Sequence, residues 1–320
     1  MITVFTPAYN RAHSIHRVYD SLKAQTYHEF EWIVVDDGSS DNTEEVIKTY
    51  MAHDNFFEIR YFYQPNQGKH IATNRAVQEA RGEMFITIDS DDGCKPQALE
   101  HLMAIWQTIP EKQKKLYKGV SCRCCKPETP DEIIGTHLKG DMWRGYAYLD
   151  SNDHDLRYIY RVKGELWGMT RREVMLENPY PEIKGLHFYP EGVYWGKIGS
   201  KYMTRYFDDP LRYYYIDGNT EDNQLTKRVN ENESYYAREY MLSAGVLRRY
   251  FKYDPINFLK QAVGFTRDGF LIGKSVTEML KTASATKRGY FLCLCSLPIG
   301  KYLQVTVQRN RKKNKGKTGY

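Results

Sequence analysis

Short apolar runs alternate with segments of helical periodicity over the first hundred residues, and this alternation constrains the fold more than any other feature of the sequence. The apolar runs predict strands at residues 2–5, 32–35, 57–62 and 84–88. Apolar residues at spacings of three and four predict helices at residues 15–22, 43–51 and 70–80. A chain that repeats strand, helix and strand forms parallel strands joined by right-handed crossovers. The sequence therefore predicts an α/β fold with a mostly parallel central sheet that helices flank.

The regular alternation ends near residue 108. From there the chain mixes turn signals with short helical stretches, and beyond Gly218 the pattern is largely helical. The helices that we expect in this part lie at residues 171–176, 191–201, 235–250 and 258–263. We therefore predict two halves of one α/β domain, 1–108 and 109–217, and a helical C-terminal extension, 218–320, whose last dozen residues are disordered.

The net charge is distributed unevenly along the chain. The formal charge is +6, yet residues 279–320 hold ten Lys or Arg residues and no Asp or Glu. The remainder of the chain therefore carries a net charge of about −4. A nucleic-acid-binding protein places its cations over the surface that meets the phosphates, so we expect no nucleic-acid partner.

Three carboxylates follow the strand expected at 84–88: Asp89, Asp91 and Asp92, with Ser90 between the first two. Ligands gather at the carboxyl ends of the strands in an α/β sheet. Carboxylates this close repel one another unless a cation neutralises them. Hard divalent cations prefer carboxylate oxygens and keep positions open for phosphate and water. The turn therefore indicates a metal and phosphate site, and the alternative is a solvated acidic turn that caps the helix expected from Pro96.

A second acidic turn, Asp36-Asp37-Gly38-Ser39, follows the strand expected at 32–35. Asp41 and Glu44 resemble a capping box for the next helix, which gives these two acids a structural use. The capping box does not involve Asp36 or Asp37. A carboxylate at either position can accept a hydrogen bond from the imino group of uracil or from a ribose hydroxyl. Two acidic turns at strand ends of one sheet favour a metal and nucleotide site.

Two further segments supply candidates for nucleotide binding. The first strand ends at Thr6-Pro7-Ala8-Tyr9-Asn10-Arg11, which is either an ordinary turn or a loop that surrounds the base, with Tyr9 packed against it. Lys69 follows Asn66-Gln67-Gly68 at the start of a helix, where it either meets a diphosphate or is simply solvated. Neither G-x-G-x-x-G after the first strand nor G-x-x-x-x-G-K-[ST] occurs, so dinucleotide oxidoreductases and P-loop phosphotransferases are not expected.

Four segments together resemble glycosyltransferase family 2: TPAYNR, VVDDGSSDNT, NQGK and IDSDDGCKP, in this order over roughly residues 1–105. WGM at 167–169 and FYPEGVYW at 188–195 resemble the family more loosely. The resemblance implies a GT-A fold and inverting transfer from a nucleotide-diphosphate sugar, with UDP expected as the nucleotide. It also implies Mg²⁺ or Mn²⁺ as cofactor and a carbohydrate or lipid-linked acceptor, as in bacterial cell-surface polysaccharide synthesis.

The resemblance also assigns roles to individual residues. Asp37 would contact the base, and Asp89 and Asp91 would form the D-x-D signature, with Asp91 or Asp92 as the direct metal ligand beside Asp89. The residues placed at the nucleotide are Thr6, Pro7, Tyr9, Arg11, Asp37, Lys69, Asp89 and Ser90. A catalytically inactive module that binds sugar nucleotides or glycans on the same fold is the alternative, although such a relic is expected to lose these acids.

The family expects a carboxylate base about a hundred residues beyond the D-x-D signature, and Glu191 occupies that position. Many members carry Asp after this Glu, whereas this chain has Gly192. The resemblance therefore assigns the role of catalytic base to Glu191. The alternative is that Glu191 stabilises a helix N-terminus, which favours acidic residues.

The C-terminal residues bear on location. Residues 289–307 are apolar in pieces, interrupted by Pro298, Gly300 and Lys301, and the basic tail follows. This order suits peripheral contact with an anionic membrane, and the alternative is a solubilising tail behind a core helix. The start of the chain has the pattern of a strand and turn rather than of a signal peptide. We therefore expect a cytoplasmic protein at the inner face of the plasma membrane.

Overall fold

The computed structural model describes residues 1–53, 56–183, 186, 188–215 and 231–315. The chain divides into two compact units. The first, called the sheet unit below, comprises Met1–His187 and Trp195–Thr220, and the second, the helical unit, comprises Phe188–Tyr194 and Glu221–Tyr320. The predicted division of the first unit at residue 108 stays a prediction.

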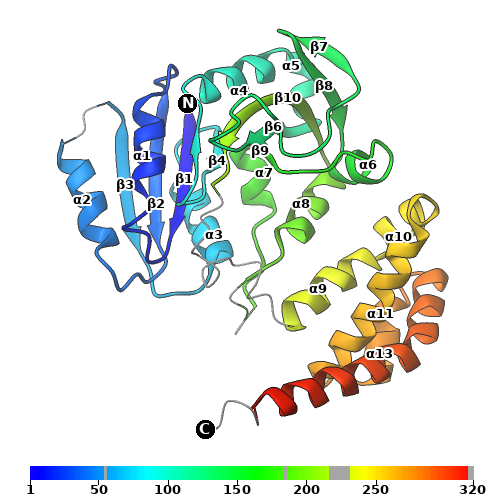
Figure 1. Ribbon diagram of the computed structural model, residues 1–320. Helices are drawn as coiled ribbons and strands as arrows, with labels where there is room; N and C mark the ends of the chain where they lie inside the picture. The colour runs from blue at the N-terminus through cyan, green and yellow to red at the C-terminus, as the bar shows by residue number, and fades with distance from the viewer. Residues whose placement is uncertain (54–55, 184–185, 187, 216–230, 316–320) are drawn as a thin grey trace. The chain divides into compact units, whose positions relative to one another are not determined.

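Within the described residues of the sheet unit, ten strands form one mixed sheet in the order β3-β2-β1-β4-β9-β6-β10-β8-β7, with β5 paired to β10 (Figure 1). The strands are β1 (Ile2–Ala8), β2 (Phe30–Asp36), β3 (Glu58–Tyr63), β4 (Met84–Thr87), β5 (Gly93–Cys94), β6 (Tyr117–Cys125), β7 (Asp141–Trp143), β8 (Tyr146–Ser151), β9 (Leu166–Arg171) and β10 (Met203–Tyr213).

The α/β class is confirmed, and the first four strands in the order pair in parallel as the alternation predicted. The remainder of the sheet is mixed. β9 is antiparallel to both β4 and β6, β10 is parallel to β6, and β8 is antiparallel to β10. Fewer strand pairs are therefore parallel than expected. The segment beyond residue 108 showed no alternation of strands and helices, so the strand directions there could not be predicted.

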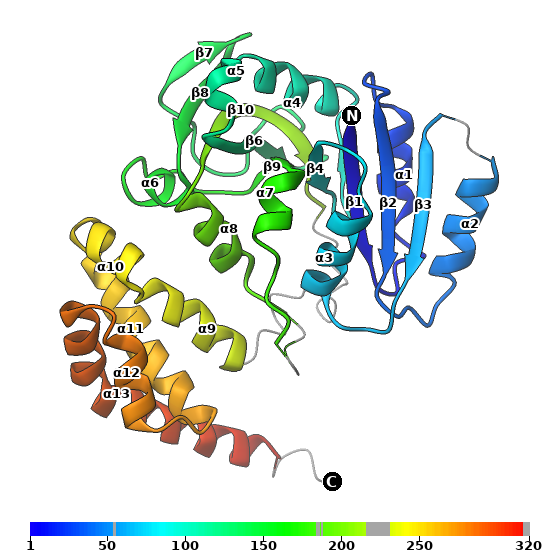
Figure 2. The same cartoon turned by 180° about the vertical axis from the view of Figure 1, so that it is seen from behind.

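Helices flank this sheet, and α1 and α2 lie on the side of the strands that faces the viewer in Figure 1 and away in Figure 2. The helices before the helical unit are α1 (His16–Lys23), α2 (Thr43–His53), α3 (Lys69–Glu79), α4 (Ala98–Gln107), α5 (Glu111–Lys114), α6 (Asp153–Tyr158) and α7 (Arg172–Glu177). α8 (Glu191–Gly199) begins in the helical unit and ends in the sheet unit. α4 starts two residues after Pro96, where the sequence predicted a helix to begin.

The core of the sheet unit is built around β2. All seven residues of this strand are buried, as expected for a parallel strand that helices cover on both faces. Trp32 and Val34 pack in one cluster with Ile2, Val4 and Val18 of β1 and α1. Each large apolar side chain that is fully buried contributes about 1.5–3 kcal/mol. The strand ends, from which the acidic turns leave, are therefore rigidly placed.

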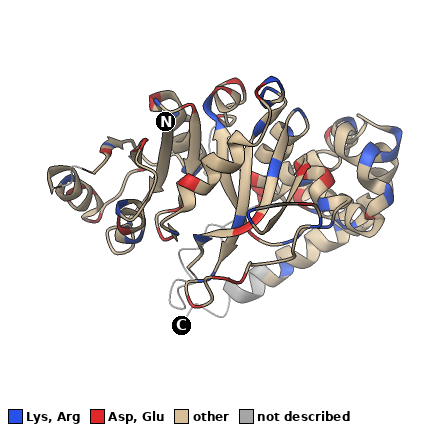
Figure 3. Cartoon of the chain, turned by 90° about the horizontal axis from the view of Figure 1, so that it is seen from above, with Lys and Arg blue, Asp and Glu red and all other residues tan. Residues whose placement is uncertain are grey.

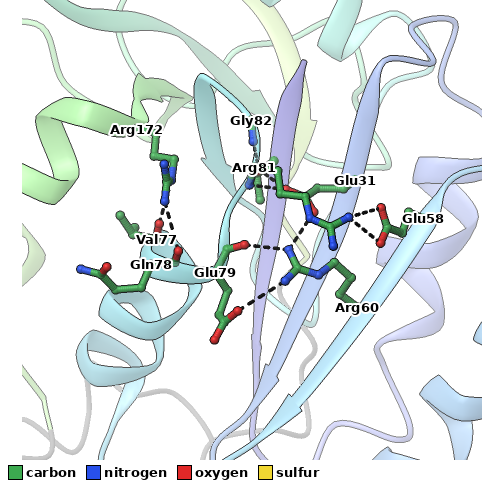
Figure 4. A network of polar contacts seen from close by, with 10 residues as sticks. Glu31, Glu58, Arg60, Val77, Gln78, Glu79, Arg81, Gly82 and Arg172 are labelled. Carbon is green, nitrogen blue, oxygen red and sulfur yellow. Dashed lines mark hydrogen bonds and ion pairs between the residues drawn. The ribbon is translucent and has the colours of Figure 1, made fainter.

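A buried polar network joins the amino ends of the strands, opposite the acidic turns (Figure 4). Glu31 is 1% exposed and accepts hydrogen bonds from Thr3 Oγ1 (2.7 Å), the Arg81 backbone N–H (2.6 Å) and Arg60 Nη1 (3.0 Å). Arg60 Nη1 also donates to the carbonyl oxygen of Glu79 (2.7 Å). Because each partner is satisfied, the network fixes this end of the sheet.

The helical unit consists of α9 (Glu231–Met241), α10 (Ala244–Tyr250), the 3-10 turn η2 (Phe251–Tyr253), α11 (Pro255–Leu271), α12 (Val276–Ala283) and α13 (Lys287–Lys315). The single helix predicted at 235–250 is thus two helices. Asp254 caps α11 by accepting from the Asn257 N–H, with Pro255 as the first helical residue. Ser275 and Glu278 form a capping box for α12.

α13 corrects one expectation about the C-terminus. The helix continues through Pro298 and Gly300 and ends at Lys315. The prediction of disorder is therefore wrong for residues 309–315, and residues 316–320 lie outside the described part of the chain. Packing against α11 compensates for the hydrogen bond that Pro298 removes, and Thr266 Oγ1 of α11 donates to the Ser296 carbonyl oxygen at 3.1 Å.

Candidate active site

The acidic turn Asp89–Asp92 lies between β4 and β5, at the carboxyl end of the parallel strands. The Asp92 N–H donates to the Asp89 carbonyl oxygen (3.0 Å) and closes the turn. Ser14 Oγ, beside α1, donates to the carbonyl oxygen of Ser90 (3.1 Å). β5 then pairs with β10. The position of the turn is therefore determined by α1 and two strands rather than by local sequence alone.

The Asp89 carboxylate lies between two cations. Its Oδ1 accepts from Lys69 Nζ (2.6 Å) and its Oδ2 from Arg212 Nη2 (2.6 Å). Burial acts to raise the pKa of Asp89, but the Lys69 ammonium and the Arg212 guanidinium together hold this pKa well below its usual range. Asp89 is therefore ionised at neutral pH, and the two cations balance most of the repulsion within the turn.

Asp92 is an internal anchor of the turn. It is 2% exposed, and it accepts from Arg212 Nε (2.9 Å), from Arg212 Nη2 and from the Tyr215 backbone N–H (3.0 Å). Burial raises the pKa of Asp92 to about 6, although the Arg212 guanidinium opposes the shift. A carboxylate enclosed in this way presents little surface to a ligand. Its assignment as the direct metal ligand stays a prediction that this burial does not favour.

Asp91 differs from Asp89 and Asp92 in the hydrogen bonds to its carboxylate. Its side chain is partly exposed, and among the described residues none is found to donate to its carboxylate, whereas its carbonyl oxygen accepts from Arg17 Nη1 (3.0 Å). The described residues contain no group of three or more His, Cys, Asp or Glu side chains placed to hold a metal ion. The chain would therefore supply one or two carboxylate oxygens, and phosphate and water the rest, which fits the way Mg²⁺ binds in phosphate sites.

The second acidic turn connects the loops after β2 and β3 through Asp37. This residue is 5% exposed, and it accepts from Gln64 Nε2 (2.8 Å), the Gln67 N–H (2.9 Å) and the Gly68 N–H (2.7 Å). A carboxylate has about four lone-pair sites, so these three donors leave little capacity for a base. Its contact with the base stays a prediction, and its structural role is to hold the loop that leads into α3.

Asp36 and Gly38 complete this connection. Asp36 accepts from the Ser39 N–H (2.8 Å) and from Tyr61 Oη (2.8 Å). Gly38 has φ of +84°, and a Cβ atom there would lie 2.8 Å from the Asn66 nitrogen. Only glycine suits this conformation and this close approach. The turns after β2 and β3 therefore form one rigid edge.

The loop after β1 contacts both acidic turns. Arg11 Nε donates to Ser90 Oγ (3.1 Å), and the Asn10 N–H donates to Ser39 Oγ (2.8 Å). Tyr9 is 45% exposed, so its ring is available to pack on a base. Thr6, by contrast, is fully buried and accepts from Trp32 Nε1 (3.0 Å). The nucleotide contact assigned to Thr6 stays a prediction that its burial does not favour.

The structure thus brings together the residues predicted at 6–11, 36–37, 69 and 89–92. It also adds residues that the sequence did not single out, chiefly Arg212, which bonds both Asp89 and Asp92, and Arg17, whose guanidinium stacks on the Tyr215 ring at 4.3 Å. The sequence carried no distinct signal for Arg212, because β10 (MTRYFDDPLRY) contains three other charged residues and burial is not visible in the sequence.

Glu191 is the first residue of α8 and is partly exposed. A Cβ atom at the following Gly192 would meet nothing within 4 Å, so the Asp that many family members carry there would fit locally. Residues Phe188–Tyr194 belong to the helical unit, whereas the acidic turns belong to the sheet unit. The role of Glu191 as catalytic base therefore stays a prediction.

A mixed α/β sheet whose parallel strand ends gather a D-x-D turn and the loops after β1, β2 and β3 is the arrangement of a GT-A glycosyltransferase. Residues 3–112 match the profile "Glycosyl transferase family 2". This match identifies residues 3–112 as a glycosyltransferase family 2 domain, and the resemblance in the four motif segments is confirmed.

Curated relatives agree with this assignment. The chain is 28% identical over 254 residues to the uncharacterised glycosyltransferase YibD of Escherichia coli (strain K12), which covers 78% of this chain and 70% of that protein. It is 34% identical over 120 residues to the glycosyltransferase GlyG of Streptococcus pneumoniae, covering 37% of this chain and 38% of that protein. An uncharacterised glycosyltransferase of Rickettsia felis matches at 34% over 139 residues, and the match spans only 22% of its length.

Solved structures show the same fold. Staphylococcus aureus TarS 1-349 in complex with UDP-GlcNAc superposes with a TM-score of 0.58 at 15% identity, covering 97% of this chain and 92% of that one. The mannosyltransferase PcManGT from Pyrobaculum calidifontis, in complex with GDP-Man and Mn²⁺, has a TM-score of 0.54 at 15% identity, covering 95% and 86%. At these identities the comparison establishes the GT-A fold.

Proposed function

We propose that this chain is an inverting glycosyltransferase that transfers a sugar from a UDP-sugar to a carbohydrate or lipid-linked acceptor in cell-surface polysaccharide synthesis. The observation that carries the proposal is the partly exposed Asp91 carboxylate, held on a rigid edge beside Asp89 and Lys69. We place the reaction in the cytoplasm, at the inner face of the plasma membrane. The fold of UDP-bound and UDP-GlcNAc-bound TarS supports UDP as the nucleotide, and the transferred sugar is a hexose or an N-acetylhexosamine.

The acidic turn would serve the leaving group. Asp91, beside Asp89, would hold Mg²⁺ or Mn²⁺, whose charge stabilises the negative charge that builds on the leaving diphosphate. Lys69 starts α3 at the same edge, and its ammonium supplies a second positive charge there. Asp89 and Arg212 hold each other through a 2.6 Å hydrogen bond, so the turn needs little reorganisation as the reaction proceeds.

Glu191 would serve the acceptor. The acceptor hydroxyl must lose its proton as its oxygen attacks the anomeric carbon, and a carboxylate within about 3 Å of that hydroxyl can accept the proton. With one base on the face opposite the leaving group, and no carboxylate acting as nucleophile, a single displacement inverts the anomeric configuration.

The proposal is tested with a panel of UDP- and GDP-sugars, each with Mg²⁺, Mn²⁺ or EDTA, by following release of the free nucleoside diphosphate. We expect slow hydrolysis of one UDP-sugar, its acceleration by a suitable glycan acceptor, and its loss in EDTA. Thermal stabilisation by a nucleotide sugar without any turnover, with or without candidate acceptors, would instead identify an inactive sugar-nucleotide-binding module.

Glu191→Gln should separate binding from turnover. We expect donor affinity and melting temperature to stay near those of the wild type, while transfer to the acceptor falls by about 10²-fold or more. Donor binding is measured by calorimetry and transfer by product formation. Glu182→Gln, at an exposed carboxylate of the sheet unit, is the control and should leave both unchanged. A Glu191 variant that lost donor affinity alone would not act as the base.

A further inference from the structure

α13 carries apolar residues on its exposed side as well as on its buried side. The side that packs inside the helical unit contains Gly289, Leu292, Cys293, Ser296, Gly300 and Gln304. The opposite side, called the outer face below, is exposed at Tyr290, Phe291, Leu294, Ile299 and Tyr302. A surface helix of a soluble domain normally carries polar residues on its solvent side. A contiguous apolar outer face instead marks a surface that meets another apolar phase or a partner.

The exposure of this face is substantial. Phe291 is 63% exposed, Ile299 is 52% and Tyr302 is 71%. The window of α13 that is apolar enough to cross a membrane, within Lys287–Asn310, is only 28% buried, so this helix is not a core helix of the unit. These side chains lie within about three helical turns of one another, and together they form one surface.

The charges that accompany the outer face are of one sign. Lys287, Arg288, Lys301 and Arg309 are exposed on the same helix, and residues 279–320 contain no Asp or Glu. In Figure 3 the helix that leads to the C-terminus is tan over most of its length, with Lys and Arg in blue. A second copy of this face would place its own cations against these cations, and the two sets would repel each other. An anionic lipid surface, in contrast, attracts each of the cations.

Packing within the helical unit decides how the helix would meet lipid. Gly300 lies so close to α11 that a Cβ atom there would be 2.1 Å from Thr266 Oγ1, and Lys301 lies over the Phe270 ring at 4.8 Å. α11 also carries Asp268, which is fully buried and paired with Arg238 (2.9 Å). If α13 crossed a bilayer, it would have to leave α11 or draw charged residues into the hydrocarbon, which is costly.

We propose that the outer face of α13 docks in the plane of an anionic bilayer. Phe291, Leu294 and Ile299 enter the boundary between headgroups and acyl chains, and the Lys and Arg side chains meet the lipid phosphates. The inner side of the helix stays packed on α11. The proposal rests on the helical unit alone, so it stands or falls separately from the proposed transfer reaction.

The test is flotation of the full-length protein with vesicles of phosphatidylglycerol and phosphatidylcholine, compared with vesicles of phosphatidylcholine alone. We expect binding to the anionic vesicles that weakens in high salt. Phe291→Ser combined with Ile299→Ser should weaken this binding by about tenfold, because two apolar side chains no longer enter the lipid. Both residues are exposed, so the fold should be retained, as checked by circular dichroism and melting temperature.

Leu116→Ser combined with Met142→Ser is the matched control, since these apolar residues of the sheet unit are 53% and 64% exposed. This control should bind vesicles as the wild type does. Equal vesicle binding by the α13 variant and the wild type, or no binding by the wild type, would overturn the proposal. Light scattering tests whether the outer face instead joins two copies of the chain. If the wild type formed an oligomer, did not bind vesicles, and was dissociated by the α13 substitutions, the outer face would be a contact between copies.

Discussion

Asp91→Asn is expected to abolish transfer while leaving the fold intact. The Asp91 carboxylate accepts no hydrogen bond that we find within the described part of the chain, so its loss should not change the melting temperature by more than about 2 °C. Transfer should fall by at least about 10²-fold, because the charge that would hold the cation at the leaving diphosphate is gone. Calorimetry of Mn²⁺ in the presence of UDP should show weakened metal binding, and product formation reports the rate.

Asp92→Asn distinguishes the two candidate metal ligands. Its carboxylate is buried and paired with Arg212, so this variant should lose stability first and activity as a consequence. Asp131→Asn, at a carboxylate that is 96% exposed, is the control for an altered charge in the sheet unit. A stable Asp92 variant that had lost metal binding, beside an active Asp91 variant, would show that Asp92 is the ligand and Asp91 is not.

Arg212→Met should produce the largest loss of stability. The methionine keeps much of the volume but leaves Asp92 buried without its cation and removes one partner of Asp89. Removing one partner of a buried ion pair costs about 3–5 kcal/mol, which for a unit of this size lowers the melting temperature by about 10 °C. Differential scanning calorimetry of the whole chain should show this shift in the transition of the sheet unit.

Arg81→Met is the matched control, because Arg81 pairs with Glu58 at 2.8 Å where both side chains are more than half exposed. That substitution should cost at most about 1 kcal/mol. Equal shifts of the melting temperature in the two Arg variants would argue against a buried role for Arg212.

The ion pairs of Asp89 also predict a pH dependence of stability. The pKa of Asp89 is lower in the folded state than in the unfolded state. Its contribution to the free energy of unfolding is therefore complete above about pH 4, the range of an unperturbed Asp, and is lost as the pH falls further.

The first half of the sheet was predictable because its signal is local. The apolar runs and helical spacings of residues 1–88 lie within single elements, and parallel strands bring their carboxyl ends to one edge of the sheet. Asp89 and Asp91 were therefore expected at this edge, and the family resemblance placed Arg11 and Lys69 beside them. The observed hydrogen bonds from Lys69 to Asp89 and from Arg11 to Ser90 agree with that expectation.

The remainder depended on contacts between residues far apart in the chain. Arg212 lies 123 residues from Asp89, and no spacing rule connects a residue of β10 with a turn after β4. The insertion of β9 between β4 and β6 was likewise hidden, because antiparallel pairing over such a separation leaves no periodicity in the sequence. The helical state of residues 309–315 was also missed, because a polar, basic sequence gives no apolar spacing from which the end of α13 could be predicted.

The network around Glu31 has a consequence for engineering this enzyme. It fixes the amino ends of β1, β2 and β3, while the loops that would select the donor leave the opposite ends. Libraries that randomise exposed positions such as Tyr9 and Tyr63 should thus mostly yield soluble variants, since neither side chain belongs to that network. Exposed side chains at one edge of the sheet can in this way be varied without a change to the network at the opposite edge.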